Sequence, residues 1–199
     1  MSHLEMFQLT YNYWIPILQE SLPKHLYYHS VDHTLQVMES AEIIGVSEGL
    51  NSDEINLLKI ATTLHDTGFL KSAAEHERIG CEMATDFLKS IHMIAEDIER
   101  VCSMIMATKI PQSPNNKLDR IICDADLSYF GTDNYDTISN LLFMELGAMG
   151  KEMDQKSWID LQIGFLEKHA FFTEFAKKNF DEVKSKHFNR LKNLRKALK

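Results

Sequence analysis

The chain of 199 residues contains few residues that break or reverse a helix. It has 4 prolines and 8 glycines. Because turns and hairpins use both residues heavily, this scarcity argues against a β-rich fold and favours long helices. The 3 cysteines cannot all pair within one chain, and none occurs as Cys-x-x-Cys. We therefore expect them to be small buried residues of a protein in a reducing compartment.

Two further absences concern membranes and secretion. No apolar run reaches the length that a bilayer-spanning helix needs. The N-terminal stretch MSHLEMFQLTYNYWIPIL lacks the basic start and the uninterrupted apolar core of a signal peptide. These features predict a cytoplasmic protein with no membrane partner.

Positive charge is also in short supply, and the formal net charge is −8. This balance argues against a nucleic-acid partner. With 44% hydrophobic and 25% charged residues, the composition is otherwise that of an ordinary globular chain. We expect one domain over residues 1–199, burying roughly 70% of the surface that the unfolded chain exposes.

Apolar residues recur with a period near that of a helix, and strand-like alternation is absent. The sequence therefore predicts an all-α bundle of about eight or nine helices. Asn51-x-x-Glu54 and Ser72-x-x-Glu75 resemble capping boxes and predict two helix starts. The expected helices span residues 4–22, 31–46, 51–68, 72–91, 95–108, 116–130, 133–149, 154–171 and 173–197.

Helix-breaking residues define the remaining boundaries. Pro16 predicts a break or a new start inside the first helix. Gly68 is expected to end the third helix. The stretch KIPQSPNN, residues 109–116, holds two of the prolines and predicts an irregular loop, a kind of segment that often lines a site.

Acidic side chains interrupt apolar segments at two places. His65 and Asp66 lie within INLLKIATTLHDTGF, and Asp124 and Asp126 lie within IICDADLSYFG. A buried carboxylate is costly unless a partner compensates its charge. A divalent cation held by histidine nitrogens and aspartate oxygens provides that compensation. Two acids two positions apart cannot face the same way on a helix, and we expect Asp126 to point inward.

Two histidines precede these acids in the stretch LYYHSVDHT. His29 and His33 are four residues apart and share one face if the segment is helical. Any one of these residues alone is more often a hydrogen-bonded core or surface residue than a ligand. Helical cores can, however, project ligands from several helices to one point. The candidate ligands in chain order are His33, His65, Asp66 and Asp126.

This ordered set resembles the H…HD…D pattern of the HD-domain superfamily of metal-dependent phosphohydrolases. YHSVDHT is similar to the Y-H-N-x-x-H-[AT] motif of a subset that includes cyclic-nucleotide phosphodiesterases, with Ser30 in place of the usual Asn. In that subset the first histidine is a proton donor and the second is a ligand. The resemblance therefore implies His29 as the donor and His33 as a ligand. DADLSYFG is similar to the last motif of the family and supports Asp126.

The resemblance covers residues 26–131 and implies an HD-type bundle on which helices of residues 133–199 pack. It also implies one or two divalent ions, which can be Mn, Mg, Zn, Fe or Ni, with Asp66 bridging two of them. A metal-activated water would attack phosphorus, and His29 would protonate the leaving oxygen. The expected substrate is a small phosphoester or nucleotide, and a homo-oligomer is possible.

Further residues are candidates beside ordinary alternatives. EHERIG is similar to the H-x-x-x-G segment of two-metal HD proteins and makes His76 a ligand or else a surface histidine. MATKIP suggests that Thr108 and Lys109 contact substrate, with Lys109 holding a phosphate, although lysines are usually solvated. QIGF is similar to the Gln-x-x-Phe clamp of cyclic-nucleotide phosphodiesterases, which implies that Gln162 and Phe165 bind a base; an ordinary packed helix is the alternative.

Two other kinds of protein stay open. Some HD-fold proteins use a di-iron pair to activate oxygen and need additional histidine ligands, of which His76 could be one. A non-catalytic HD signalling module would keep the fold, but a degenerate copy usually loses a ligand. The residues do not choose the substrate.

Overall fold

The computed structural model describes residues 1–198, and over these residues the chain is entirely helical. It contains nine α-helices and two short 3₁₀ helices, with no strand in the described part, which confirms the predicted all-α fold. The elements are α1 (His3–Ser21), α2 (Val31–Ser47), α3 (Ser52–Leu64), η1 (Thr67–Leu70), α4 (His76–Ser90), α5 (Ala95–Ala107), α6 (Lys117–Asp126), η2 (Ser128–Gly131), α7 (Tyr135–Ala148), α8 (Gln155–Lys168) and α9 (Glu174–Ala197).

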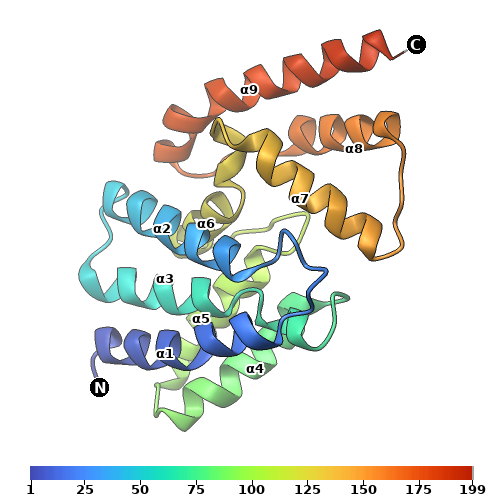
Figure 1. The fold of residues 1–199 in the computed structure, drawn as a ribbon. Helices are drawn as coiled ribbons and strands as arrows, with labels where there is room; N and C mark the ends of the chain where they lie inside the picture. The colour runs from blue at the N-terminus through green and yellow to red at the C-terminus, as the bar shows by residue number, and fades with distance from the viewer. Residues whose placement is uncertain (199) are drawn as a thin grey trace.

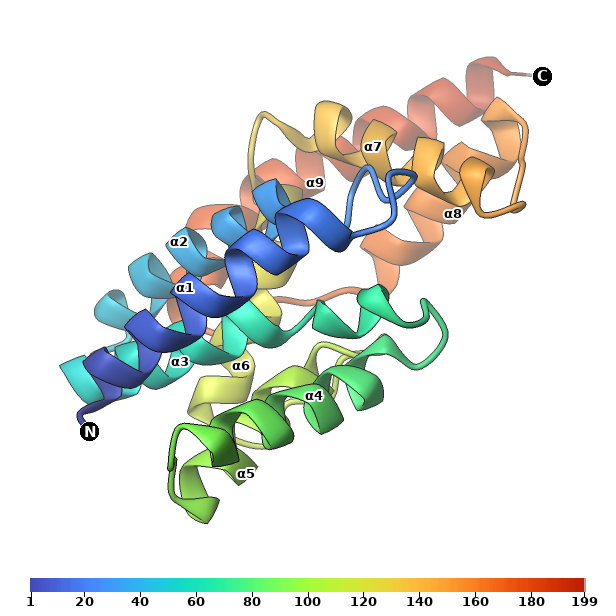
Figure 2. The same ribbon diagram turned by 60° about the horizontal axis from the view of Figure 1, so that its bottom comes forward.

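The first six helices share one hydrophobic core. In Figures 1 and 2, α1, α2 and α3 lie side by side, with α4 and α5 beneath them and α6 behind. The side chains at the centre of this core are aliphatic and fully buried. They include Ile44, Leu57, Leu58, Ile60, Leu64, Ile105, Ile121 and Ile122. Burying such a side chain contributes roughly 1.5–3 kcal/mol, so this layer is a rigid base for the site.

The last three helices form a second layer with a core of its own. Figure 1 shows α7, α8 and α9 together above the first layer, and α9 extends along the upper edge to the C-terminus. Their core is largely aromatic and takes in residues from the first layer as well. Gly131 joins the layers closely, because a Cβ on it would lie 2.2 Å from the Cβ of Phe180 in α9.

One of the two predicted capping boxes is present and the other is not. The side chain of Asn51 accepts from the backbone of Glu54, and Glu54 reciprocates, as predicted. The predicted start at Ser72 is wrong, because α4 begins at His76. Ser72 Oγ instead accepts from the amide of Ala74 within a turn, a local bond that competes with helix formation.

Two predicted helices end earlier than expected. The third ends at Leu64 and the sixth at Asp126, and each is followed by a 3₁₀ turn where the sequence predicted continuing helix. Asp66 has left the helical conformation, with φ −103° and ψ 5°. The helical period continues through both turns, and hydrophobic spacing therefore does not detect them.

The remaining boundary signals divide in the same way. Residues 109–116 form the irregular loop that was predicted. The break predicted at Pro16 is wrong, because α1 is continuous from His3 to Ser21. Trp14, Ile15 and Leu18 are buried around the proline, and this packing outweighs the local cost of the ring. Across the described residues, no helix combines the length and apolarity that crossing a membrane requires.

Candidate metal centre

Four side chains from three separate parts of the chain meet in a small space. His33 lies in the first turn of α2, His65 and Asp66 follow α3, and Asp126 ends α6. His33 Nε2 is 3.1 Å from Asp126 Oδ1 and 3.6 Å from Asp66 Oδ2. His65 Nε2 is 3.3 Å from Asp66 Oδ2 and 3.8 Å from Asp126 Oδ1. Two nitrogens and two carboxylates are therefore directed at one point.

The helix ends explain how these side chains reach that point. Ser30, which stands where related motifs have Asn, caps α2 by accepting from the amide of His33 at 3.4 Å. Asp66 directly precedes η1, and Asp126 comes two residues before η2. At both aspartates the backbone is leaving the α-helix, and the side chain points along the end of the helix rather than from its side.

The atoms at the centre of the cluster are suited to a metal ion. His65 Nδ1 donates to the carbonyl of Thr62 at 2.8 Å, which leaves Nε2 to face the cluster. His65 Nε2 and Asp66 Oδ2 are buried without a hydrogen-bond partner, although buried polar atoms are nearly always paired. Ligand atoms of His33, His65 and Asp66 lie within 4.8 Å of one another, and this group could hold a metal ion.

The electrostatics of the cluster also favour a cation. Burial alone would lower the pKa of His65, but the charges of Asp66 and Asp126 raise it to about 9. Burial alone would raise the pKa of Asp66, but His65 beside it, with His29 and His33, holds that pKa well below its usual value. The carboxylates therefore draw positive charge into a buried place, and a divalent cation supplies the same charge.

His76 lies beside this cluster at the first position of α4. Gly68 makes the close approach possible, because a Cβ on it would lie 1.9 Å from the carbonyl oxygen of His76. Glu75 turns the chain into α4 with a left-handed φ of 57°. His76 Nε2 is 3.6 Å from Asp66 Oδ1 and 3.5 Å from Oε1 of Glu77, a second buried carboxylate.

His29 is held by a residue that the sequence reasoning missed. Glu145 on α7 is 1% exposed. It accepts from the backbone amides of Tyr28 at 2.8 Å and His29 at 3.0 Å, and from Nδ1 of His29. Glu145 stands alone among apolar residues in NLLFMELGAMG. That is the same signal that identified Asp66, so it could have been found.

The environment of His29 keeps its ring charged. Burial alone would lower the pKa of His29, but the hydrogen bond with Glu145 and the charges of Asp66, Glu145 and Asp126 together raise it above its ordinary value of 6.5. The ring also stacks on Phe69 of η1, with centroids 4.2 Å apart. Since Nδ1 is bound to Glu145, Nε2 is the nitrogen left to transfer a proton.

The two aspartates of IICDADLSYFG have separate partners. Asp126 points into the cluster, as its distances to His33 and His65 show. Asp124 is fully buried and accepts from the amides of Phe172 and Thr173, at 2.9 and 2.8 Å, and from the hydroxyl of Thr173. Asp124 thereby ties the start of α9 to α6.

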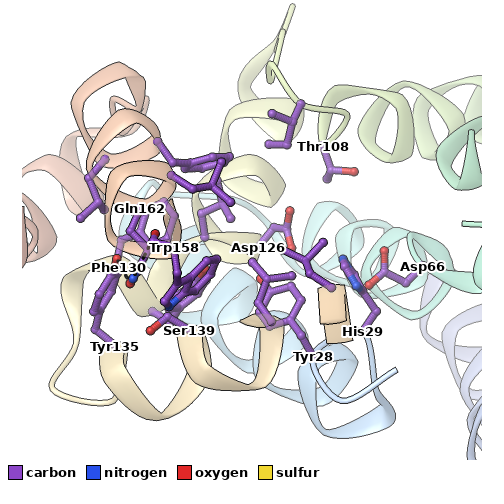
Figure 3. A pocket seen from close by; sticks show the side chains of 18 of the residues that line it. Tyr28, His29, Asp66, Thr108, Asp126, Phe130, Tyr135, Ser139, Trp158 and Gln162 are labelled. Carbon is purple, nitrogen blue, oxygen red and sulfur yellow. Dashed lines mark hydrogen bonds between the residues drawn. The ribbon is translucent and has the colours of Figure 1, made fainter. Parts of the chain in front are cut away.

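A cavity of about 480 Å³ runs from the cluster toward the second layer. Figure 3 shows His29 and Asp66 at one end of the row of labelled side chains and Gln162 and Tyr135 at the other. Gln162 is buried, and its Oε1 accepts from the hydroxyl of Tyr135 at 3.0 Å. Phe165 lines the same end and packs edge-on against Phe130.

The two residues of MATKIP lie in different places. Thr108 is buried and lines the cavity, and its hydroxyl donates to the carbonyl of Ile105 at 2.8 Å. Lys109 is exposed and lines a separate hollow with Met106 and Pro111. The fold does not bring Lys109 to the cavity, because the chain has already turned away from the site at the end of α5.

An all-α domain in which histidine and aspartate side chains from three segments meet at a buried point has the design of a helical metal centre. Residues 30–128 match the family model described as HD domain. The chain therefore belongs to the HD-domain superfamily, as its motifs predicted. No curated protein matches it in sequence.

Three solved structures share the fold. A predicted HD superfamily hydrolase from an uncultured Thermotogales bacterium has a TM-score of 0.61 and 20% identity, covering 100% of this chain and 94% of that one. Bacillus subtilis YpgQ, in complex with ADP, has a TM-score of 0.69 and 19% identity, covering 99% and 97%. A Lactobacillus plantarum protein has a TM-score of 0.72 and 15% identity, covering 96% and 97%. At such identities the likeness establishes the fold alone.

Proposed function

We propose that this protein is a metal-dependent phosphohydrolase that cleaves a phosphoester bond of a small, nucleotide-like substrate. The observation that carries the proposal is the pair of buried atoms without a hydrogen-bond partner, His65 Nε2 and Asp66 Oδ2, which face each other between His33 and Asp126. Their arrangement opens into a cavity large enough for a small ligand.

His33, His65, Asp66 and Asp126 are the residues that would hold a divalent cation. Once bound, the cation supplies positive charge that lowers the pKa of water and offsets the charge of phosphoryl oxygens. Asp66 is the carboxylate suited to serve two ions, because its Oδ2 faces His65 and its Oδ1 faces His76. Mn, Mg, Zn, Fe and Ni all remain candidates for such a mixed set of nitrogen and oxygen ligands.

His29 is the proposed proton donor to the leaving oxygen. Its raised pKa keeps a proton available at neutral pH, and Glu145 fixes the ring by binding Nδ1. Since Nδ1 is committed to Glu145, the proton at Nε2 is the one that can be delivered. Glu145 thus acts through His29 and is a positioning residue.

The far end of the cavity would receive the organic part of the substrate. Gln162 offers its amide to a polar edge, and Phe165 offers a ring face for stacking. Thr108 can accept one hydrogen bond midway, since its own proton is donated to Ile105. We leave Lys109 out of the proposed machinery because it lies outside the cavity.

A di-iron oxygenase is a second candidate, and one observation favours it. His76 and Glu77 lie beside Asp66, and a second metal could therefore be held next to the first. Colour, stoichiometric iron and oxygen consumption would identify that activity. Phosphate release with Mn, Mg or Zn would identify the hydrolase.

The test of the proposal is substitution of Asp66. Asp66→Ala should reduce bound metal to background and lower phosphate-releasing turnover by at least about 100-fold, because one change removes both the anionic ligand and the charge that holds the cation. Asp86→Ala removes an exposed aspartate from α4 and is the matched control. Metal content is measured by elemental analysis and folding by circular dichroism. Stoichiometric metal and unchanged turnover in Asp66→Ala would refute the proposal.

A further inference from the structure

The cavity is strongly divided in its charge. All three carboxylates that line it, Asp66, Glu77 and Asp126, belong to the end at the metal cluster. Among the lining residues of the described chain, Lys151 is the one lysine and arginine is absent. Lys151 is exposed in the connection between α7 and α8. The protein therefore provides almost no fixed positive charge inside the cavity.

The middle and the far end are walled by apolar side chains. Leu142 and Leu146 come from α7, Leu161 and Phe165 come from α8, and Leu127 follows α6. The polar groups at this end are few, and the most buried of them, Gln162, is already paired with a hydroxyl. Such a wall stabilises an apolar or aromatic group and gives a charged group no compensation.

From this division we infer the class of substrate, in a step that rests on the proposed function. We propose that the substrate carries a single phosphate, as a monoester or diester, joined to an aromatic or otherwise apolar organic group that fills the cavity beyond the metal cluster. Nucleoside diphosphates, triphosphates and pyrophosphorylated nucleotides are excluded as preferred substrates.

The reason lies in where a second and third phosphate would have to go. Only the cluster end gains positive charge when metal binds, and that charge is matched by Asp66, Asp126 and Glu77. A phosphate chain extending from the cluster would pass between Leu127 and the leucines of α7. Sites for phosphate chains use several arginines, lysines or free backbone amides to replace the lost hydration, and this part of the cavity has none of those side chains in its lining.

The experiment uses the metal-loaded full-length protein and two matched substrate series. The first compares naphthyl phosphate with glycerol phosphate, which have one phosphate each but differ in the organic group. The second compares AMP, ADP and ATP, which share the base but differ in phosphate number. We expect kcat/KM for naphthyl phosphate, and for AMP, to exceed that of the other members of each series by about tenfold or more, which is 1.4 kcal/mol.

A charge-gain variant tests the same inference in the opposite direction. Leu142→Lys places a cation in the cavity wall on α7 and should narrow the preference for AMP over ADP while weakening naphthyl phosphate. Met144→Lys adds the same charge to an exposed position of α7 outside the cavity and should leave both ratios unchanged. If Leu142→Lys fails to fold, Ser139→Ala and Leu161→Lys report on the same wall.

Binding measured by calorimetry, with a non-hydrolysable phosphonate for each ligand, separates this inference from the proposed function. Selective binding of the single-phosphate aromatic ligands without any phosphate release would uphold the inference and overturn the hydrolase. Hydrolysis with equal or better use of ADP and ATP, or of glycerol phosphate, would overturn the inference and leave the hydrolase standing. Hydrolysis with the expected order supports both.

Discussion

The layer that carries the ligand cluster and the layer that covers it are built from different side chains. The core of α1 to α6 is mostly aliphatic, with residues such as Leu57 and Ile121 fully buried. The core of α7 to α9 is mostly aromatic, with Tyr135, Phe171 and Tyr129 among its members. The first layer brings the metal-binding side chains together, whereas the second supplies the cavity wall and Glu145.

This difference separates two tasks of the site. Close-packed aliphatic cores hold side chains within small tolerances, which a metal centre needs. Aromatic side chains leave larger gaps where they meet edge to face, as Phe130 does with Phe165. Chemistry is therefore assigned to the first layer and ligand selection to the second, with Glu145 as the contact through which the second layer acts on the first.

The largest expected effect contrasts the two neighbouring aspartates. Asp126→Ala should lower metal content and reduce turnover by at least about 100-fold, with little change in folding stability. Asp124→Ala should leave metal bound but destabilise the fold by about 3 kcal/mol, because three donors from Phe172 and Thr173 lose their buried acceptor. Elemental analysis and urea unfolding measure the two quantities. The reverse pattern would show that the division between the layers is drawn in the wrong place.

A smaller effect is expected where the layers act together. Glu145→Gln keeps an oxygen for the amides of Tyr28 and His29 but removes the charge that raises the pKa of His29. The proton donor is active when protonated, and a lower pKa therefore means that activity is lost at lower pH as the pH rises. We expect the basic limb of the kcat profile to move down by about one unit for substrates with poor leaving groups.

The matched variant for that experiment is His29→Ala, which should retain metal and lose the basic limb altogether. A profile for Glu145→Gln that coincides with the unchanged protein would assign Glu145 a purely structural role. Equal loss of metal in His29→Ala would make His29 a ligand rather than a donor.

The smallest effect concerns the second layer alone. Tyr135→Phe removes the hydroxyl that holds Oε1 of Gln162, and KM should rise about threefold to tenfold while kcat is unchanged. Tyr13→Phe, at an exposed position of α1, should change neither parameter. Steady-state kinetics on a single substrate are sufficient, and a fall in kcat without a change in KM would place Tyr135 in the chemical step instead.

The sequence predicted more about the first layer than about the second. Acids that interrupt apolar runs identified Asp66 and Asp126, and the same signal at Glu145 went unused. The short turns η1 and η2 were predicted as helix because their apolar spacing continues the helical period. Lys109 illustrates the limit of a motif, since neighbouring residues in the chain can face different cavities.

The sequence by itself determined the helical class, the order of the ligand residues and the HD-domain resemblance, because periodicity and residue type are local properties of a chain. Only the tertiary structure decided that Glu145 meets His29 and that Lys109 lies apart. It also decided that the cavity is charged at one end and apolar along the rest. Those features depend on how α7 and α8 lie across the first layer, and this is fixed by contacts between residues more than a hundred positions apart, such as Tyr28 and Glu145.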